Sequence, residues 1–176
     1  MKINKEYIKP AVLGASDGIV TTFAVVAGVV GAGLATEIII VLGIANMFAD
    51  GFSMAVGDYL GERSLQKMEA IEKDDDVSDS GYIWKTSLAT FVAFILAGSL
   101  PLLPYVIMLF GFTVSADNQF SLSIIATMSA MFFVGSLRTY VIKGKWWING
   151  LEMLAVGSVA ATVAYVLGSV VEGFLK

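Results

Sequence analysis

Five long runs of apolar residues, separated by short polar segments, dominate the pattern of this chain. The runs cover residues 10–34, 36–61, 82–110, 120–142 and 147–174. Each is long enough to cross a hydrocarbon core of about 30 Å as a helix. Pro101 and Pro104 are expected to kink or end the third run, because proline lacks the amide that an α-helix uses. The pattern predicts an all-α integral membrane bundle of five transmembrane helices in a single domain, residues 1–176.

Composition supports a membrane protein. Hydrophobic residues make up 57% of the chain and the mean hydropathy is +0.80, whereas soluble domains contain about 45–50% apolar residues. The first apolar run continues without a small-residue cleavage site, so we interpret it as a span and not as a signal peptide. The net charge of −4 gives no support for nucleic-acid binding.

The basic residues predict the orientation of the bundle. Those on one side of the predicted spans are Lys2, Lys5, Lys9, Arg63, Lys67, Lys73, Lys85, Arg138, Lys143 and Lys145, and the other side has only Lys176. By the positive-inside rule, the N-terminus is cytoplasmic and the C-terminus is outside. Trp84, Trp146 and Trp147 fall at the cytoplasmic interface, where aromatic residues are enriched.

Side chains that can bind a cation recur at every fourth position of the second predicted span. They are Asn46, Asp50, Met54, Asp58 and Glu62. Four residues are slightly more than one helical turn, so these side chains form one slowly winding stripe. A carboxylate near the bilayer centre costs at least about 2.5 kcal/mol, so the stripe requires a cation, a proton or water. We expect it to line a metal pathway.

Asp17 adds a carboxylate from the first predicted span, which a short connection makes the antiparallel neighbour of the second. Counting 1.5 Å per residue from the cytoplasmic side puts Asp17 and Met54 at one level, roughly 10 Å deep. The alternative is that Asp17 caps a broken helix and that the acids of the second span bond to nearby hydroxyl groups. Thr21, Thr22 and Ser53 are available for this.

The available ligands restrict the metal. The chain contains no Cys and no His, so a bound metal must use carboxylates, amides, carbonyl groups and methionine sulfur. Carboxylates suit Fe²⁺, Mn²⁺, Ca²⁺ and Mg²⁺, and a thioether favours the later transition metals.

Three further features each have two interpretations. The pairs Gly14 with Gly18 and Gly57 with Gly61 predict either ordinary close packing or a homodimer interface along the first span. Arg138 and Glu152, near the cytoplasmic ends of the last two spans, predict a structural ion pair, with a role of Glu152 in proton or metal entry as the alternative. The acidic cytoplasmic loop at residues 62–81 either attracts cations or is simply solvated.

Four segments resemble the vacuolar iron transporter family. They are GASDGIVTTFAVVAG at 14–28, ADGFSMAVGDYLGERS at 49–64, PLLPY at 101–105 and GLEMLAVGSVAATVAYVLG at 150–168. The resemblance implies five transmembrane helices, a homodimer, and movement of Fe²⁺ or Mn²⁺ out of the cytosol in proposed exchange for protons. It assigns Asp17 and Met54 to a translocation path at the dimer interface.

One departure from the family pattern concerns the connection between the second and third spans. Plant members carry a metal-binding domain of several helices there, and residues 62–81 are too few for such a domain. The chain therefore resembles the short-loop branch found in prokaryotes, which implies the plasma membrane. Asn46 and Asp50 also stand where the plant pattern is mostly small and apolar.

These observations predict a divalent transition-metal exporter for Fe²⁺ or Mn²⁺, acting by proton antiport as a homodimer. No resident cofactor is expected, and the metal ion and the proton are the substrates. The alternatives are a passive cation channel and a non-transporting membrane subunit that assembles through its glycine-rich faces. An enzyme is not expected, because the chain has no His or Cys and no Ser beside an evident base.

Overall fold

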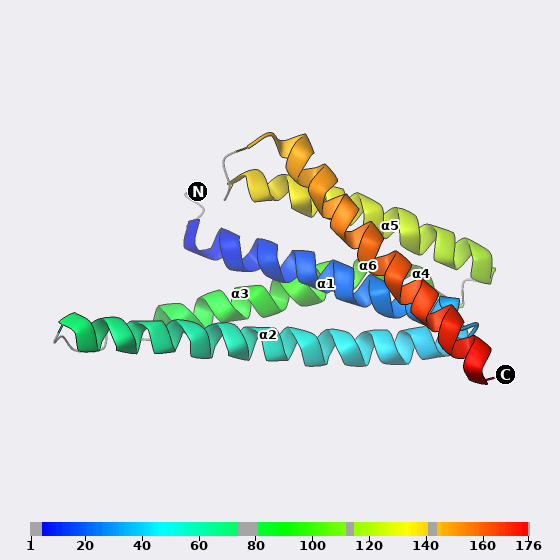
Figure 1. Cartoon of the computed structure of the whole chain (residues 1–176), viewed down its shortest axis with the longest axis horizontal. Helices are drawn as coiled ribbons and strands as arrows, with labels where there is room; N and C mark the ends of the chain where they lie inside the picture. The colour runs from blue at the N-terminus through cyan, green and yellow to red at the C-terminus, as the bar shows by residue number, and fades with distance from the viewer. Residues whose placement is uncertain (1–4, 74–80, 112–114, 141–143, 176) are drawn as a thin grey trace.

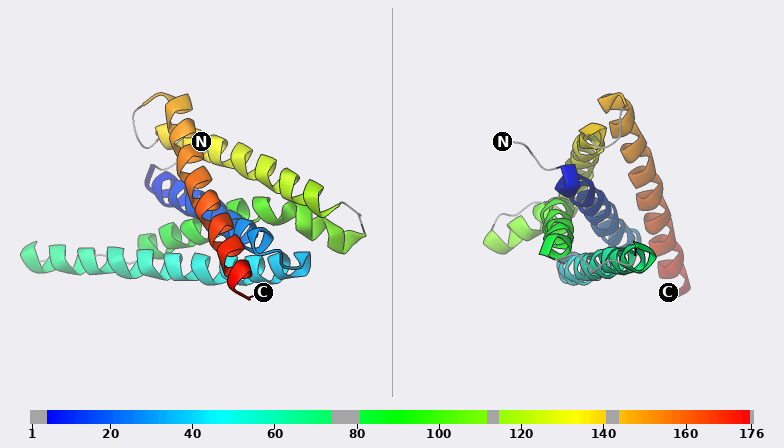
Figure 2. Two further views of the ribbon diagram at one scale, coloured as in Figure 1. Left: turned by 45° about the vertical axis from the view of Figure 1, so that its right-hand side comes forward. Right: turned by 90° about the vertical axis from the view of Figure 1, so that its left-hand side faces the viewer.

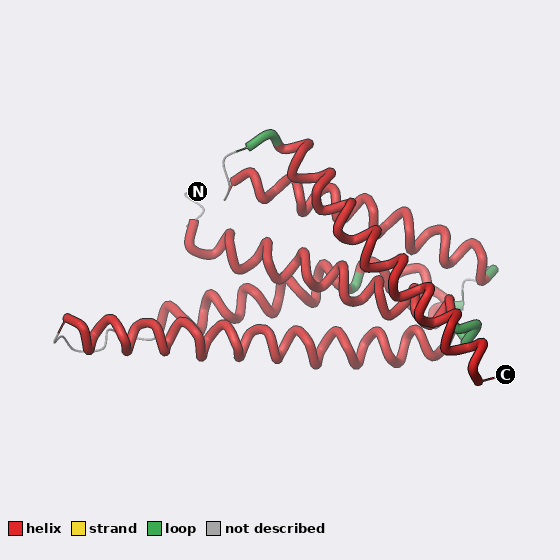
Figure 3. Tube along the Cα trace, in the orientation of Figure 1, coloured by secondary structure: helices red, strands yellow, loops and turns green. Residues whose placement is uncertain are grey.

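The computed structural model describes residues 5–73, 81–111, 115–140 and 144–175, and this part of the chain is helical apart from short turns (Figure 3). Its five long helices are α1 (Lys5–Gly31), α2 (Thr36–Lys73), α3 (Gly81–Gly98), α5 (Ala116–Leu137) and α6 (Trp146–Leu175). Five helical segments are long and apolar enough to cross a membrane, the third of which continues from α3 to Val106. The predicted all-α bundle of five membrane-spanning helices is confirmed.

Helix α1 is the central element. It packs against α2, α3, α5 and α6, while α2 and α3 lie side by side along one flank (Figure 1). Seen along the bundle, α5 and α6 form the opposite flank (Figure 2). Of the residues in the core, Ile19 and Val26 of α1 are fully buried. In contrast, the apolar side chains of α6 are mostly exposed, as expected for a helix that faces lipid.

Glycines allow α1 to approach its neighbours closely. A Cβ atom at Gly18 would lie 2.5 Å from the carbonyl oxygen of Phe94 in α3, and one at Gly14 would overlap the carbonyl oxygen of Thr90. These two glycines therefore pack within the chain, which excludes them from a homodimer interface along α1. A Cβ at Gly57 or at Gly61 would meet nothing within 4 Å.

The third span is broken, as its prolines predict. Helix α3 ends at Gly98 and is followed by the 3₁₀ turn η1 (Leu100–Leu102), α4 (Leu103–Val106) and the second 3₁₀ turn η2 (Ile107–Phe110). Breaking a helix inside the membrane leaves carbonyl groups without intrahelical partners. The hydroxyl of Ser123 in α5 donates to the carbonyl oxygen of Pro101 at 2.7 Å, which satisfies one of them.

Helix α2 is longer than the sequence predicted. It was expected to end at Gly61, with a loop over residues 62–81, but it continues to Lys73. Glycine weakens a helix interior by only about 1 kcal/mol, and the following residues are good helix formers. Residues Asp74, Asp75, Asp76 and Asp79 of the expected acidic loop lie outside the described residues, as do Lys2, Lys143 and Lys176.

Candidate functional site

The hairpin of α1 and α2 places Asp17 opposite Asp50. Asp17 lies 14 residues before the end of α1 at Gly31, and Asp50 lies 14 residues after the start of α2 at Thr36. The sequence predicts Met54 at the level of Asp17. An equal count of residues from the connection at 32–35 reaches Asp50, one helical turn before Met54.

The residues of the predicted stripe on α2 differ in how deeply they are buried. The side chains of Asn46, Asp50, Met54 and Asp58 are partly buried, whereas Glu62 is exposed beyond them. Asn46 donates a hydrogen bond from Nδ2 to Oδ2 of Asp50 at 2.9 Å. The four partly buried residues thus form a polar surface with an internal hydrogen bond, and Glu62 is the last residue of the stripe.

Asp58 has a partner from another helix. The hydroxyl of Thr90 in α3 donates to Oδ2 of Asp58 at 3.2 Å. The prediction that acids of the second span bond to hydroxyl groups is therefore correct for Asp58, although none of the three expected hydroxyls supplies the bond. The hydroxyl of Thr21 instead donates to the backbone carbonyl of Asp17 at 2.9 Å, which does not involve the carboxylate.

A single chain does not provide a complete metal site of acids. Among the described residues, no three acidic side chains come close enough together to hold a metal ion. Asp17 and Asp50 supply two carboxylates, and Met54 lies one turn away on α2. Fe²⁺ and Mn²⁺ favour more ligands than two carboxylates provide, so these two residues alone do not form a complete site for either ion.

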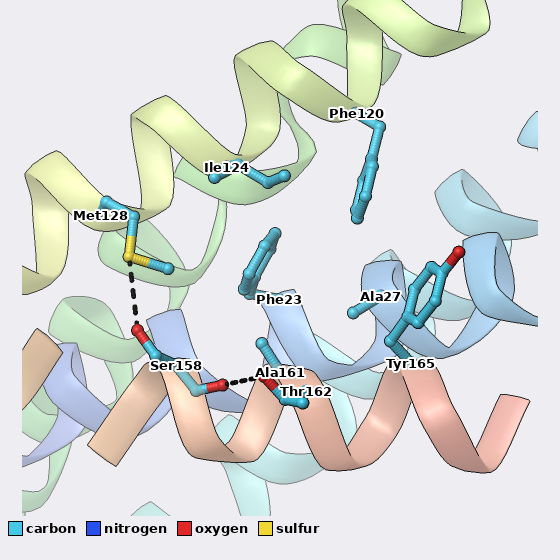
Figure 4. A pocket seen from close by; sticks show the side chains of 9 residues that line it. All are labelled: Phe23, Ala27, Phe120, Ile124, Met128, Ser158, Ala161, Thr162 and Tyr165. Atoms are coloured by element: carbon cyan, nitrogen blue, oxygen red, sulfur yellow. Dashed lines mark hydrogen bonds between the residues drawn. The ribbon is translucent and has the colours of Figure 1, made fainter. Parts of the chain in front are cut away.

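An apolar hollow on the other flank offers no carboxylate to a cation. It has a volume of about 340 Å³ and lies between α1, α5 and α6 (Figure 4). Phe23, Phe120 and Tyr165 form a stack beside it, with ring centroids 6.5 and 6.3 Å apart. Its lining contains no acidic residue.

Sequence reasoning missed a second stripe on α2. Small residues also recur at every fourth position there, each one residue before a member of the polar stripe. They are Ala45, Ala49, Ser53, Gly57 and Gly61, and all five are exposed. The same spacing rule that identified Asp50 would have identified them if the small residues had been included in the search.

The two charged residues near the ends of α5 and α6 form the predicted ion pair. Nη1 of Arg138 lies 3.8 Å from Oε2 of Glu152, and their side chains are 32% and 58% exposed. A pair this exposed contributes at most about 1 kcal/mol.

An all-helical bundle with five apolar spans defines a multi-pass integral membrane protein, and carboxylates lie within its first two spans. The model of the VIT family matches residues 8–80 and 71–169, which together cover most of the chain. The chain therefore belongs to this family, whose described members are metal-ion transporters and not enzymes. The two matched segments overlap at residues 71–80, which include the end of α2.

Several vacuolar iron transporters are similar to this chain over most of its length. The one from Plasmodium berghei is 23% identical, with 94% of this chain and 82% of the relative covered. Vacuolar iron transporter 1 from Arabidopsis thaliana is 22% identical, covering 95% and 87%. The Plasmodium alignment extends over 227 positions, although this chain has 176 residues, so the relative carries insertions that are absent here.

Proposed function

We propose that the protein exports Fe²⁺ or Mn²⁺ from the cytosol in exchange for protons, as a homodimer in a prokaryotic plasma membrane. The observation that supports this proposal is the pair Asp17 and Asp50, which lie equally many residues from the turn of the α1–α2 hairpin. Two neighbouring carboxylates within a membrane repel each other unless a cation or a proton lies between them. They therefore suit a site that alternates between metal and proton.

Met54 supports a transition metal. Its side chain is partly buried one turn from Asp50, on the same stripe of α2. A thioether is a soft ligand, so it favours Fe²⁺ and Mn²⁺ over Ca²⁺ and Mg²⁺, although only weakly. A site built of oxygen ligands alone would lack this preference. The relatives named vacuolar iron transporters also support a transition metal as the substrate.

The exposed small residues of α2 support the homodimer and change its expected position. Gly57 and Gly61 have open space in front of their Cα atoms, and small residues four apart allow two membrane helices to approach closely. In this arrangement the α2 helices of the two copies meet along the Ala45–Gly61 stripe. The adjacent polar stripe of each copy then lies beside the twofold axis, where Asp50 and Met54 of both copies complete one site.

The direction of transport follows from the orientation and the chemistry. The distribution of basic residues supports a cytoplasmic location of the N-terminus and of the Asp58 end of α2. A metal ion enters there past Glu62 and Asp58 and binds between Asp17, Asp50 and Met54. Protons arriving from outside neutralise the carboxylates, weaken the site and release the metal.

The test is metal flux into proteoliposomes, with and without an imposed pH gradient. Wild type is compared with Asp17→Asn and Met54→Ala, and with Glu37→Gln as a control that removes an exposed acid at the start of α2. We expect gradient-driven flux of Fe²⁺ or Mn²⁺ that both site variants lose and the control keeps.

Other outcomes would favour the alternatives. Flux that is independent of the pH gradient would favour a passive cation channel. If well-folded wild type moves neither metal, transport of these ions is wrong. If the acid-to-amide change alters only assembly, the protein is a membrane subunit.

A further inference from the structure

A groove opens between α2 and α3, and no residue of the small-residue stripe lines it. Its volume is about 350 Å³, and its walls are formed by Phe52, Val56 and Tyr59 of α2 and by Trp84, Leu88 and Phe91 of α3. From Trp84 to Phe91 the groove extends about 10 Å along α3, which is most of the depth of one leaflet, about 15 Å. A groove of this length and lining matches the first part of a lipid acyl chain.

One polar group in the groove has no partner. Ser87 belongs to the lining, its residue is only 4% exposed, and its hydroxyl makes no hydrogen bond in the described part of the chain. A buried hydroxyl without a partner costs free energy, so its presence indicates a missing acceptor. Ser87 lies one turn below Trp84, and tryptophan marks the boundary between headgroups and hydrocarbon. The ester oxygens of a phospholipid lie at that level.

Two basic residues lie beyond the groove on α2, in the direction of the membrane surface. Arg63 lies one turn beyond Tyr59 on the same face of α2, and Lys67 lies one turn beyond Arg63. Both side chains are exposed. Two like charges four residues apart repel one another, and a phosphate between them would remove this cost. Their long side chains reach along the helix to the headgroup region while the charge stays hydrated.

We propose that this groove binds a phospholipid with an anionic headgroup. One acyl chain lies against Phe52, Val56 and Leu88, the Ser87 hydroxyl donates to an ester oxygen, and Arg63 and Lys67 bind the headgroup phosphate. The proposal does not depend on which ion is transported. The lipid would fix α2 against α3, where Thr90 bonds to Asp58 of the polar stripe.

The test uses tryptophan fluorescence in vesicles. The chain has three tryptophans, and the double variant Trp146→Phe with Trp147→Phe leaves Trp84 as the only reporter, inside the groove. Quenching is compared between brominated phosphatidylglycerol and brominated phosphatidylcholine with the same chains. We expect about 25-fold stronger association of the anionic lipid, because Arg63 and Lys67 near the membrane surface each contribute about fivefold.

Three variants in this background separate the parts of the proposal. Arg63→Gln with Lys67→Gln should abolish the preference for the anionic lipid. Lys9→Gln with Lys145→Gln removes the same charge from exposed residues at the same end of the bundle, and should preserve it. Ala55→Phe, which fills the groove, should reduce quenching by both lipids.

The proposal is overturned if the two lipids quench Trp84 equally, if both double charge variants lose the preference, or if Ala55→Phe changes nothing. If the single-tryptophan protein is not monodisperse, native mass spectrometry replaces the fluorescence. Wild type should then retain phosphatidylglycerol in preference to phosphatidylcholine, and Arg63→Gln with Lys67→Gln should not. Equal retention by the two proteins would contradict the proposal.

Discussion

Asn46 donates a hydrogen bond from its side-chain amide to Oδ2 of Asp50, one turn further along α2, at 2.9 Å. Both side chains are partly buried, so the bond restricts the orientation of the Asp50 carboxylate. We therefore propose that Asn46 orients Asp50 as a metal ligand, while a role of Asn46 as a ligand itself stays a prediction.

The first prediction concerns this bond. Asn46→Ala should raise the metal concentration that gives half-maximal flux by about tenfold, because groups that orient a metal ligand typically contribute 10–100-fold to affinity. The maximal rate should change less. The measurement is the concentration dependence of flux in proteoliposomes, with Asn118→Ala as the control for an exposed asparagine on another helix. An unchanged half-maximal concentration would mean that Asp50 needs no orientation by Asn46.

The sequence predicted the bundle well because its physical signals are strong. Long apolar runs and the prolines at 101 and 104 determine where helices cross the membrane and where the third span breaks. The polar stripe of α2 also follows from spacing alone. The sequence alone does not determine which residue of α2 lies level with Asp17, because this depends on where the hairpin turns. A shift of one turn in that connection exchanges Asp50 for Met54.

The end of α2 and the close approach of α1 to α3 were harder to predict. Gly61 has the local character of a helix end, but a glycine within good helix formers is tolerated. Gly14 and Gly57 look alike in sequence, and only the packed structure shows that the first contacts the backbone of Thr90 while the second faces open space. The spacing of two glycines in the sequence shows that they share one face of a helix, but it does not show which helix packs against that face.

The second prediction concerns the bond between Thr90 and Asp58, 3.2 Å long. Thr90→Val should lower the free energy of unfolding by about 0.6 kcal/mol, the average for hydrogen bonds between membrane helices. Thr90→Ser keeps the hydroxyl and should restore most of it. Unfolding in mixed micelles measures the difference, and a Thr90→Val protein as stable as wild type would show that the bond does not stabilise the bundle.

The third prediction compares two glycines. Gly18→Ala should destabilise the bundle by about 1–3 kcal/mol, because the added methyl group would lie 2.5 Å from the carbonyl oxygen of Phe94. Gly57→Ala should leave the packing of the single chain unchanged, because nothing lies within 4 Å of its added Cβ. Thermal unfolding in detergent checks both, and equal stability of the two variants would contradict the packing described here.

The fourth prediction tests whether Glu152 has a role beyond its ion pair. Glu152→Gln should lower stability by less than about 1 kcal/mol, because the pair with Arg138 is exposed and screened by solvent. Flux should stay within about twofold of wild type, as for an exposed surface pair. Arg138→Gln is the matched variant. A large loss of flux in Glu152→Gln alone would support a role in proton or metal entry.

The fifth prediction tests the dimer interface on α2. The chain has no cysteine, so single cysteines report contacts between copies without further changes. Ser53 and Phe52 are neighbours and both exposed, but only Ser53 belongs to the small-residue stripe. Ser53→Cys should form a disulfide-linked dimer on mild oxidation, since residues facing each other across a close helix pair bring their Cβ atoms to about 4 Å. Phe52→Cys should remain monomeric on a denaturing gel, because its side chain faces the α2–α3 groove. If Phe52→Cys crosslinks and Ser53→Cys does not, the copies meet on the other face, and Asp50 and Met54 of two chains cannot form one site.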